Sequence, residues 1–271
     1  MTLAKAYTTS MKVFEQVSVR RNPNLLEELK SIQPGEITVV QGTYDHIEKI
    51  LDVLKVPYEM SGTLSAKDGT RVLLVNCKSY DGCHANEGMR HFVEEGGRLV
   101  TTDWALRVVT TNFPETLHKT AETNNDVVEI RCTGLGAKLI GMHYTQCHPK
   151  WWLEGSSHVY SASDAVLPLI TSEELQEKYG QPYIAVGFPH GKGEVLHFIS
   201  HIELQRTHQR TDADRKGLEE FLSKMEASKT EDMEWANVAE LEAAYSSLNT
   251  LAHLCAKSPV LAGSTKSVLR R

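Results

Sequence analysis

Short runs of apolar residues that do not alternate with polar ones restrict the fold of this chain more than any other feature. The three runs in the first half of the chain are residues 37–40, 72–75 and 98–102. Each is followed by apolar residues at helical spacing, such as Ile47, Ile50 and Leu54 after the first run. Strands that are apolar on both faces and separated by helices are typical of a covered parallel sheet. We therefore expect a doubly wound α/β fold with a mostly parallel, flavodoxin-like sheet and helices on both faces.

The second half of the chain predicts smaller β elements. Residues 127–131 and 138–142 are short β-prone pieces separated by glycines, and we interpret them as a small hairpin-like insertion. Residues 166–170 form a further strand candidate. Residues 183–188 and 194–199 flank a glycine-rich turn, which predicts an antiparallel hairpin at the edge of the sheet.

Both ends of the chain differ from this α/β pattern. Residues 1–36 suggest only a short helix around Leu25, so we interpret them as an N-terminal arm. Residues 37–225 form the predicted α/β domain, whose last helix Thr211 can cap. Residues 226–271 are expected to form a C-terminal helical extension and a flexible tail.

An apolar stripe follows one face of the predicted C-terminal helix. Trp235, Leu241, Leu248 and Cys255 recur at helical spacing along it. The stripe either packs on its own domain or docks a protein partner through residues 234–256, and periodicity does not separate these alternatives. Because most amphipathic helices of globular proteins face their own core, packing within the chain is favoured.

Composition limits the classes of function. The chain has 271 residues, 41% of them hydrophobic, and can bury a core without disulfides or metals. Its net charge of −6 argues against nucleic-acid binding, and no apolar stretch approaches the roughly 20 residues of a transmembrane helix. The five cysteines are widely spaced and odd in number, which suits a reducing compartment. We expect a cytoplasmic protein with no cofactor, and leave homo-oligomer formation open.

Two strings at predicted strand ends carry chemically active side chains. They are Thr101-Thr102-Asp103-Trp104 and Ser200-His201-Ile202-Glu203. The second resembles the His-x-Glu segment that carries two triad members in class I glutamine amidotransferases. The order of the elements over residues 37–225 is similar to that family as well. The resemblance implies that His201 and Glu203 lie at triad positions outside the carboxyl ends of the strands.

The first string departs from the family at its nucleophile. Asp103 stands where the family has its cysteine, and a carboxylate forms no thioester. Ile202 stands where the family usually has proline, and Trp104 would crowd an approaching glutamine. The resemblance therefore implies the fold without amidotransferase activity, and it points toward the trehalose-utilisation-like branch.

Asp103 has a simpler interpretation besides a catalytic one. Aspartate is among the best N-cap residues, so capping of a helix that begins at Trp104 is favoured over nucleophilic attack. His201 is then a strand-end histidine or a ligand contact, oriented by Glu203. In the alternative, Asp103 works with His201 and Glu203 in a hydrolase or transferase.

Four further residues are candidates for ligand contacts. The resemblance places Cys77 at the border of the family's active-site mouth, although a free cysteine is more often a small buried hydrophobe. Trp104 adjoins the triad position. The tandem Trp151 and Trp152 can stack on a sugar ring or pack in the core, and core packing is favoured.

Metal binding is not predicted from the cysteines and histidines. Cys77 with Cys83 and His84, and Cys147 with His148, match no standard zinc-ligand spacing.

These observations lead to one function hypothesis and two rivals. The first is a non-catalytic amidotransferase-like domain that binds a small molecule or a protein at the degenerate cleft, with carbohydrate as the ligand by analogy. The rivals are the hydrolase or transferase described above, and an adaptor that docks through residues 234–256.

Overall fold

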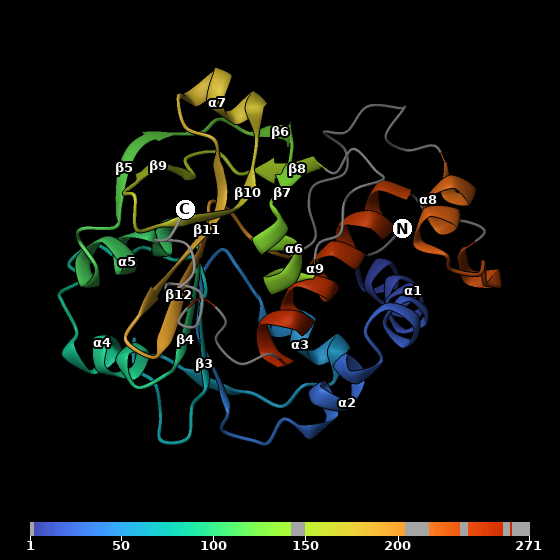
Figure 1. Cartoon of the computed structure of the whole chain (residues 1–271), viewed down its shortest axis with the longest axis horizontal. Helices are drawn as coiled ribbons and strands as arrows, with labels where there is room; N and C mark the ends of the chain where they lie inside the picture. The colour runs from blue at the N-terminus through green and yellow to red at the C-terminus, as the bar shows by residue number, and fades with distance from the viewer. Residues whose placement is uncertain (1–2, 142–149, 204–216, 234–237, 257–260, 262–271) are drawn as a thin grey trace, which may run out of the picture.

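An eight-stranded sheet forms the centre of the molecule (Figure 1). The computed structural model describes residues 3–141, 150–203, 217–233, 238–256 and 261. The sheet has the strand order β2-β1-β3-β4-β12-β11-β10-β7. Its strands are β1 (Ile37–Val40), β2 (Glu59–Ser61), β3 (Val72–Val75), β4 (Arg98–Thr102), β7 (Arg131–Cys132), β10 (Leu167–Thr171), β11 (Tyr183–His190) and β12 (Gly193–Phe198).

The pairing confirms a mixed, largely parallel α/β sheet. Strands β2, β1, β3, β4 and β12 are parallel to one another, whereas β11, β10 and β7 continue the sheet from β12 in antiparallel pairs. Every residue of β1, β3, β4 and β12 is buried. This burial on both faces is the physical reason why these strands lack polar alternation.

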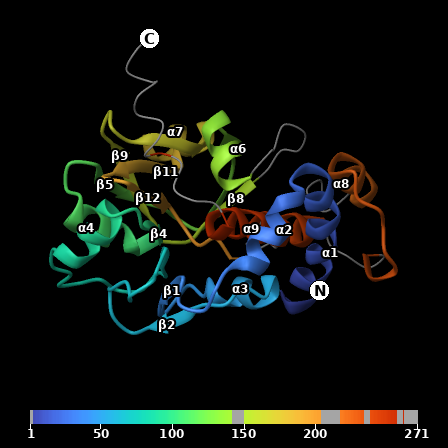
Figure 2. The same ribbon diagram turned by 60° about the horizontal axis from the view of Figure 1, so that its bottom comes forward.

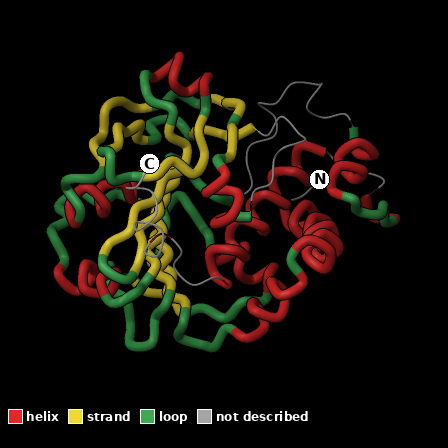
Figure 3. The backbone as a smooth tube through the Cα atoms, viewed as in Figure 1, coloured by secondary structure: helices red, strands yellow, loops and turns green. Residues whose placement is uncertain are grey.

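Helices cover the sheet on both sides. In the views of Figures 1 and 2, α4 and α5 lie on one side, and α3 and α9 lie on the other together with α1 and α2. Figure 3 shows how the helices of the two chain ends gather beside the strands. The helices are α1 (Leu3–Arg21), α2 (Pro23–Ser31), α3 (Glu48–Leu54), α4 (Glu87–Glu94), α5 (Leu106–Asn112), α6 (Gly134–Ile140), α7 (Glu173–Tyr179), α8 (Leu218–Met225) and α9 (Val238–Ala256).

The N-terminal segment is more ordered than its sequence predicted. The short helix near Leu25 is confirmed as α2, but the long helix α1 was not predicted. Helix α1 packs along α9, where the Ser10 hydroxyl donates to the Leu241 carbonyl oxygen at 2.8 Å. The mixed polarity of α1 did not predict this contact, because the partners of its buried face, α9 above all and also α2, α3 and α8, are brought to it by the tertiary fold.

The apolar stripe of α9 is covered by the chain itself. Leu241, Leu248 and Cys255 are fully buried, and the helix contacts α1, α2, α3, α6 and α8. These contacts agree with the favoured alternative, packing within the chain. Docking of a protein partner through this helix gains no support from them and stays a prediction.

Two predictions for the second half were wrong. The segment predicted as a strand at 138–142 is helical as far as Ile140, because Thr133 caps α6 with a hydrogen bond from Gly136 N at 3.0 Å. The β11–β12 hairpin is antiparallel as predicted, but β12 pairs with β4 in the middle of the sheet rather than at its edge. Hydrophobicity alone did not distinguish a central hairpin from an edge hairpin.

Two small side sheets complete the described fold. They pair β5 (Leu117–Glu122) with β9 (His158–Ala162) and β6 (Asp126–Glu129) with β8 (Lys150–Leu153). The predicted cap Thr211, the stripe residue Trp235 and the tail 262–271 lie outside the described residues. None of the described helices combines the length and apolarity needed to cross a bilayer.

Candidate functional site

The turn after β4 holds Asp103 in an unusual backbone conformation. Its φ is +48°, a left-handed value that few residues other than glycine adopt. A 3₁₀ turn, η1 (Asp103–Ala105), follows at once and leads into α5. Strand-to-helix turns of this strained kind hold catalytic nucleophiles in other enzymes. The local geometry of a nucleophile position is therefore present, with a carboxylate in it.

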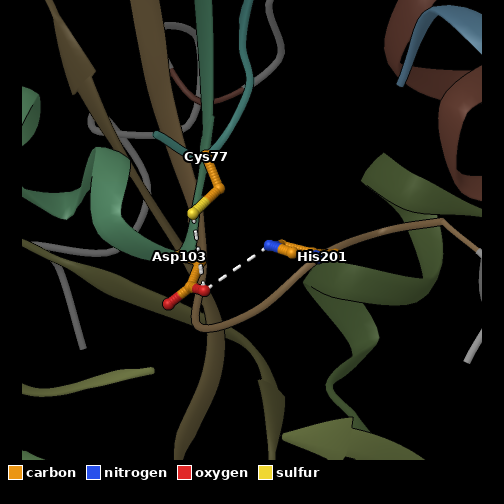
Figure 4. Close-up of side chains that lie close together, drawn as sticks. All are labelled: Cys77, Asp103 and His201. Atoms are coloured by element: carbon orange, nitrogen blue, oxygen red, sulfur yellow. Dashed lines mark hydrogen bonds and ion pairs between the residues drawn. The ribbon is translucent and has the colours of Figure 1, made fainter. Parts of the chain in front are cut away.

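Three side chains from neighbouring strand ends meet at this turn (Figure 4). Cys77 follows β3, Asp103 follows β4 and His201 follows β12, and these three strands are adjacent and parallel. The Cys77 thiol donates to Asp103 Oδ2 at 3.6 Å, and His201 Nε2 lies 3.5 Å from the same oxygen. Sequence analysis selected all three residues, and the sheet brings them together.

One acid in contact with His201 was not predicted from the sequence. Glu154 Oε2 lies 3.1 Å from His201 Nδ1 and comes from the residue that follows β8. The predicted partner Glu203 is also near, since its carboxylate, a ring nitrogen of His201 and the Asp45 carboxylate lie within 4.8 Å of one another. Nothing marks Glu154 in the sequence except its place directly after a short apolar run.

Burial dominates the electrostatics of the cluster. Removal from water raises the pKa of Asp103 from 3.8 to about 7, and the nearby His201 opposes that rise. Burial, reinforced by the Asp103 carboxylate, also raises the pKa of the Cys77 thiol well above its usual range. Burial, and to a smaller extent the negative charge of Asp45, raises the pKa of Glu203 to about 7. Cys77 is therefore held as a thiol, which is the form with low reactivity.

The capping interpretation of Asp103 was wrong. Thr102 occupies the cap position of η1 and Ala105 that of α5, and neither helix start receives a side-chain cap hydrogen bond. The left-handed turn instead directs the Asp103 carboxylate toward Cys77 and His201. The backbone conformation of a single residue decided between the two roles.

Trp104, the neighbour of Asp103 in the chain, lines a pocket whose lining does not include the three cluster residues. Its indole Nε1 donates to the Ser156 carbonyl oxygen at 2.8 Å, and its ring stacks on His158 at 6.0 Å between centroids. Burial lowers the pKa of His158 to about 4, so the imidazole is neutral at pH 7. The pocket beside Trp104 measures about 540 Å³. Its lining includes Tyr80, Asp81, Arg107, His118, Lys119 and His158.

The tandem tryptophans lie in the core rather than in this pocket. Trp151 and Trp152 are 4% and 6% exposed, and they sit in β8. The Trp151 indole donates to the Ser200 hydroxyl at 2.8 Å and stacks on Phe198. The prediction that these indoles contact a ligand is corrected to the core packing that sequence analysis favoured, because neither ring has an open face.

Two groups within the described residues have the composition and spacing of metal ligands. One is Cys77, Asp103 and His201, and the other is Asp45, His201 and Glu203. Neither includes Cys83 or His84, and the Cys83 thiol contacts its neighbour's carbonyl oxygen at 3.8 Å. Cys147 and His148 lie outside the described residues.

Comparisons with known proteins show that the fold of this chain is similar to the folds of several solved structures. No protein-family model matches the chain, and no curated protein matches its sequence. A glutamine amidotransferase from Methylobacillus flagellatus is 14% identical with a TM-score of 0.48, over 83% of this chain and 94% of that one. A ThuA-like protein from Bacteroides uniformis is 10% identical with a TM-score of 0.42, over 62% of this chain and 82% of that one.

A larger enzyme also contains a similar region. The β-galactosidase from Rahnella sp. R3 is 13% identical with a TM-score of 0.41, over 62% of this chain. The match spans 29% of the β-galactosidase, so this chain resembles only a part of that enzyme. These structural matches include proteins of the class I glutamine amidotransferase-like fold, and at this level of similarity they concern the fold alone.

Proposed function

We propose that this chain is a non-catalytic protein of the class I glutamine amidotransferase-like fold that binds a small polar ligand in the pocket beside Trp104. One observation carries the proposal. The strained turn that would present a nucleophile holds Asp103, which is 3% exposed. A carboxylate forms no thioester with glutamine, and a buried one offers no surface for a substrate to approach.

Burial of the neighbouring groups supports the same view. Cys77 is 1% and His201 is 3% exposed, so both are as inaccessible as Asp103. A general base has to reach a proton of the substrate directly or through one water molecule. Because these three groups are covered, ligand binding in the adjacent pocket is a more plausible function for this edge of the sheet than catalysis by the cluster.

The pocket has the mixed lining of a site for a small polar molecule. Trp104 and Tyr80 provide aromatic surface, and Arg107 projects from α5 without an ion pair among the described residues. Lys119 and Glu122, which also line the pocket, form an ion pair at 2.5 Å. Aromatic surface surrounded by hydrogen-bonding groups suits a hydroxyl-rich ligand, and carbohydrate is the candidate class.

The catalytic part of the proposal is tested by glutamine hydrolysis. We expect no release of ammonia from glutamine by the full chain above the level of a D103N variant. The opposite result would be turnover by the natural chain that disappears in the H201Q variant, and it would refute the non-catalytic assignment.

The binding part is tested by tryptophan fluorescence. The chain holds four tryptophans, so titration with mono- and disaccharides is compared between the natural protein and a W104F variant. We expect saturable quenching that W104F removes and R107A weakens about tenfold. The matched control K192A alters an exposed cation on the distant β11–β12 turn and should bind normally. Absence of any saturable signal would exclude carbohydrate as the ligand.

A hydrolase or transferase is the second candidate, and one distance favours it. Asp103 and His201 lie 3.5 Å apart, close enough to exchange a proton. Burial of both groups argues against it. This candidate predicts cleavage of an ester or a glycoside that is lost when Asp103, His201 or Glu203 is replaced. A panel of chromogenic esters and glycosides measures such cleavage.

A further inference from the structure

The ends of β3, β4 and β12 place three different metal-binding groups around one point. Cys77 presents a sulfur, Asp103 an oxygen and His201 a nitrogen, and the three atoms lie within 4.8 Å of one another. We propose that Cys77, Asp103 and His201 bind a divalent transition metal, with zinc as the best fit. This inference is independent of ligand binding in the pocket beside Trp104.

The distances within the cluster suit a tetrahedral ion. A zinc ion with bonds of about 2.3 Å to sulfur and about 2.0–2.1 Å to nitrogen and oxygen separates sulfur from oxygen by about 3.6 Å and nitrogen from oxygen by about 3.4 Å. The observed separations are 3.6 Å for Cys77 and Asp103 and 3.5 Å for His201 and Asp103. The three donors need little rearrangement to accept the ion.

Glu154 lies behind His201, on the side where metal-binding histidines usually have a carboxylate, and its contact is an ion pair by distance without the geometry of a hydrogen bond. Glu154 Oε2 lies 3.1 Å from Nδ1, so the opposite nitrogen, Nε2, faces Asp103. A carboxylate on the far side of a histidine ligand fixes the ring and strengthens its bond to the metal. Glu154 is therefore a positioning residue in this proposal.

The surroundings of Asp103 provide a second, independent indication of a metal site. Asp103 Oδ2 receives both contacts of the cluster. The Ser157 hydroxyl adjoins the carboxylate, but Oδ1, in a side chain that is 96% buried, accepts no hydrogen bond of good geometry among the described residues. A buried carboxylate with so few partners is costly, and a bound cation offsets that cost. The metal would complete the coordination of an acid that the fold alone leaves poorly satisfied.

The donor set selects the kind of metal. Thiolate and imidazole favour zinc and its neighbours in the first transition series, whereas magnesium and calcium require oxygen ligands. Three protein ligands leave a fourth position for water or another donor. Binding releases the Cys77 proton, so affinity falls as the pH is lowered.

Cobalt substitution tests this site directly. The full chain, stripped of metal by a chelator, is titrated with Co²⁺ while its absorption spectrum is recorded. We expect one equivalent to produce a sulfur-to-cobalt charge-transfer band together with intense visible bands of tetrahedral Co²⁺. Zinc should displace the cobalt, and mass spectrometry under native conditions should show one zinc ion per chain.

Matched variants locate the ion and separate it from the other thiols. C77S should abolish the charge-transfer band, and E154Q should weaken zinc binding about 10–100-fold. C83S is the control, because Cys83 is a partly exposed thiol outside the cluster, and it should leave the band unchanged. Circular dichroism checks that each variant is folded.

Two results would overturn the proposal. One is the absence of a charge-transfer band in the natural chain, which needs no variant to interpret. The other is a band that survives in C77S or disappears in C83S. Neither result affects the proposed non-catalytic function, which depends on glutamine hydrolysis and on ligand binding beside Trp104.

Discussion

At the scale of single residues, backbone conformation and burial decide roles that residue type leaves open. Asp103 is a good helix cap by type, but its φ of +48° turns the carboxylate into a cluster with Cys77 and His201. His197 on β12 is a further case. It is 1% exposed, its Nδ1 lies 2.9 Å from the Thr101 hydroxyl, and burial lowers its pKa to about 3. A buried neutral histidine makes stability depend on pH.

The sign of that dependence follows from proton counts. Between about pH 6.5 and pH 3 the unfolded chain protonates His197 and the folded chain does not, so acid favours unfolding. We expect H197N to be less stable than the natural protein at pH 7. The difference in the free energy of unfolding between the two proteins should become smaller as the pH is lowered toward pH 4. Because a single proton is involved, the change is at most about 1.4 kcal/mol per pH unit. Melting temperatures from pH 7 to pH 4 measure this.

A second variant is the control for His197. T101V removes the hydroxyl partner but leaves the histidine in place, so it should keep the pH dependence of the natural protein. A constant difference between H197N and the natural protein over this range would show that His197 does not titrate as expected.

At the scale of elements, close backbone contact positions the strand that leads to His201. The β11–β12 hairpin lies against the end of α4, and Gly193 opens β12 there. A Cβ atom at Gly193 would lie 2.2 Å from the carbonyl oxygens of both Val93 and Gly97. Because these neighbours are backbone atoms, they have little freedom to move away.

We expect G193A to lower the free energy of unfolding by about 1–3 kcal/mol or more through this overlap. Urea denaturation measures the change. The matched control is G62A, since a Cβ at exposed Gly62 meets no atom within 4 Å, and its effect should stay within about 0.5 kcal/mol. Equal stabilities of the two variants would contradict the assigned contact.

At the scale of the whole molecule, a buried ion pair connects the central sheet to the C-terminal helix α9 and to Leu261. Arg98 begins β4 and pairs with Glu194, the second residue of β12; both side chains are 0% exposed, and Arg98 Nη2 lies 2.6 Å from Glu194 Oε1. Arg98 also donates to the Leu254 carbonyl oxygen of α9, and Leu261 N donates to Glu194 at 2.8 Å. The pair therefore connects segments that are far apart in sequence.

Removing one partner should cost much more than removing both. E194Q leaves the Arg98 guanidinium buried without its counter-charge, and we expect a loss of about 3–5 kcal/mol in the free energy of unfolding. The double variant R98M/E194L removes both charges and should lose clearly less. Guanidinium-induced unfolding followed by circular dichroism measures both. A double variant as unstable as E194Q would argue against the buried-charge explanation.

The sequence by itself determined the parallel centre of this protein and pointed to three residues of the candidate site. Strands such as residues 72–75 are buried on both faces, so their apolar runs are unambiguous, and Cys77, Asp103 and His201 lie within three residues of the ends of such strands. Carboxyl ends of neighbouring parallel strands meet at one edge, which made their convergence predictable.

Only the tertiary structure decided the rest. Helix α1 buries one face against α9 and also contacts α2, α3 and α8, and Glu154 reaches His201 through the placement of β8. The central position of β12 depends on its pairing with β4, and the core position of Trp151 on its contact with Ser200. Each depends on a contact between segments distant in sequence, and local periodicity carries no information about such contacts.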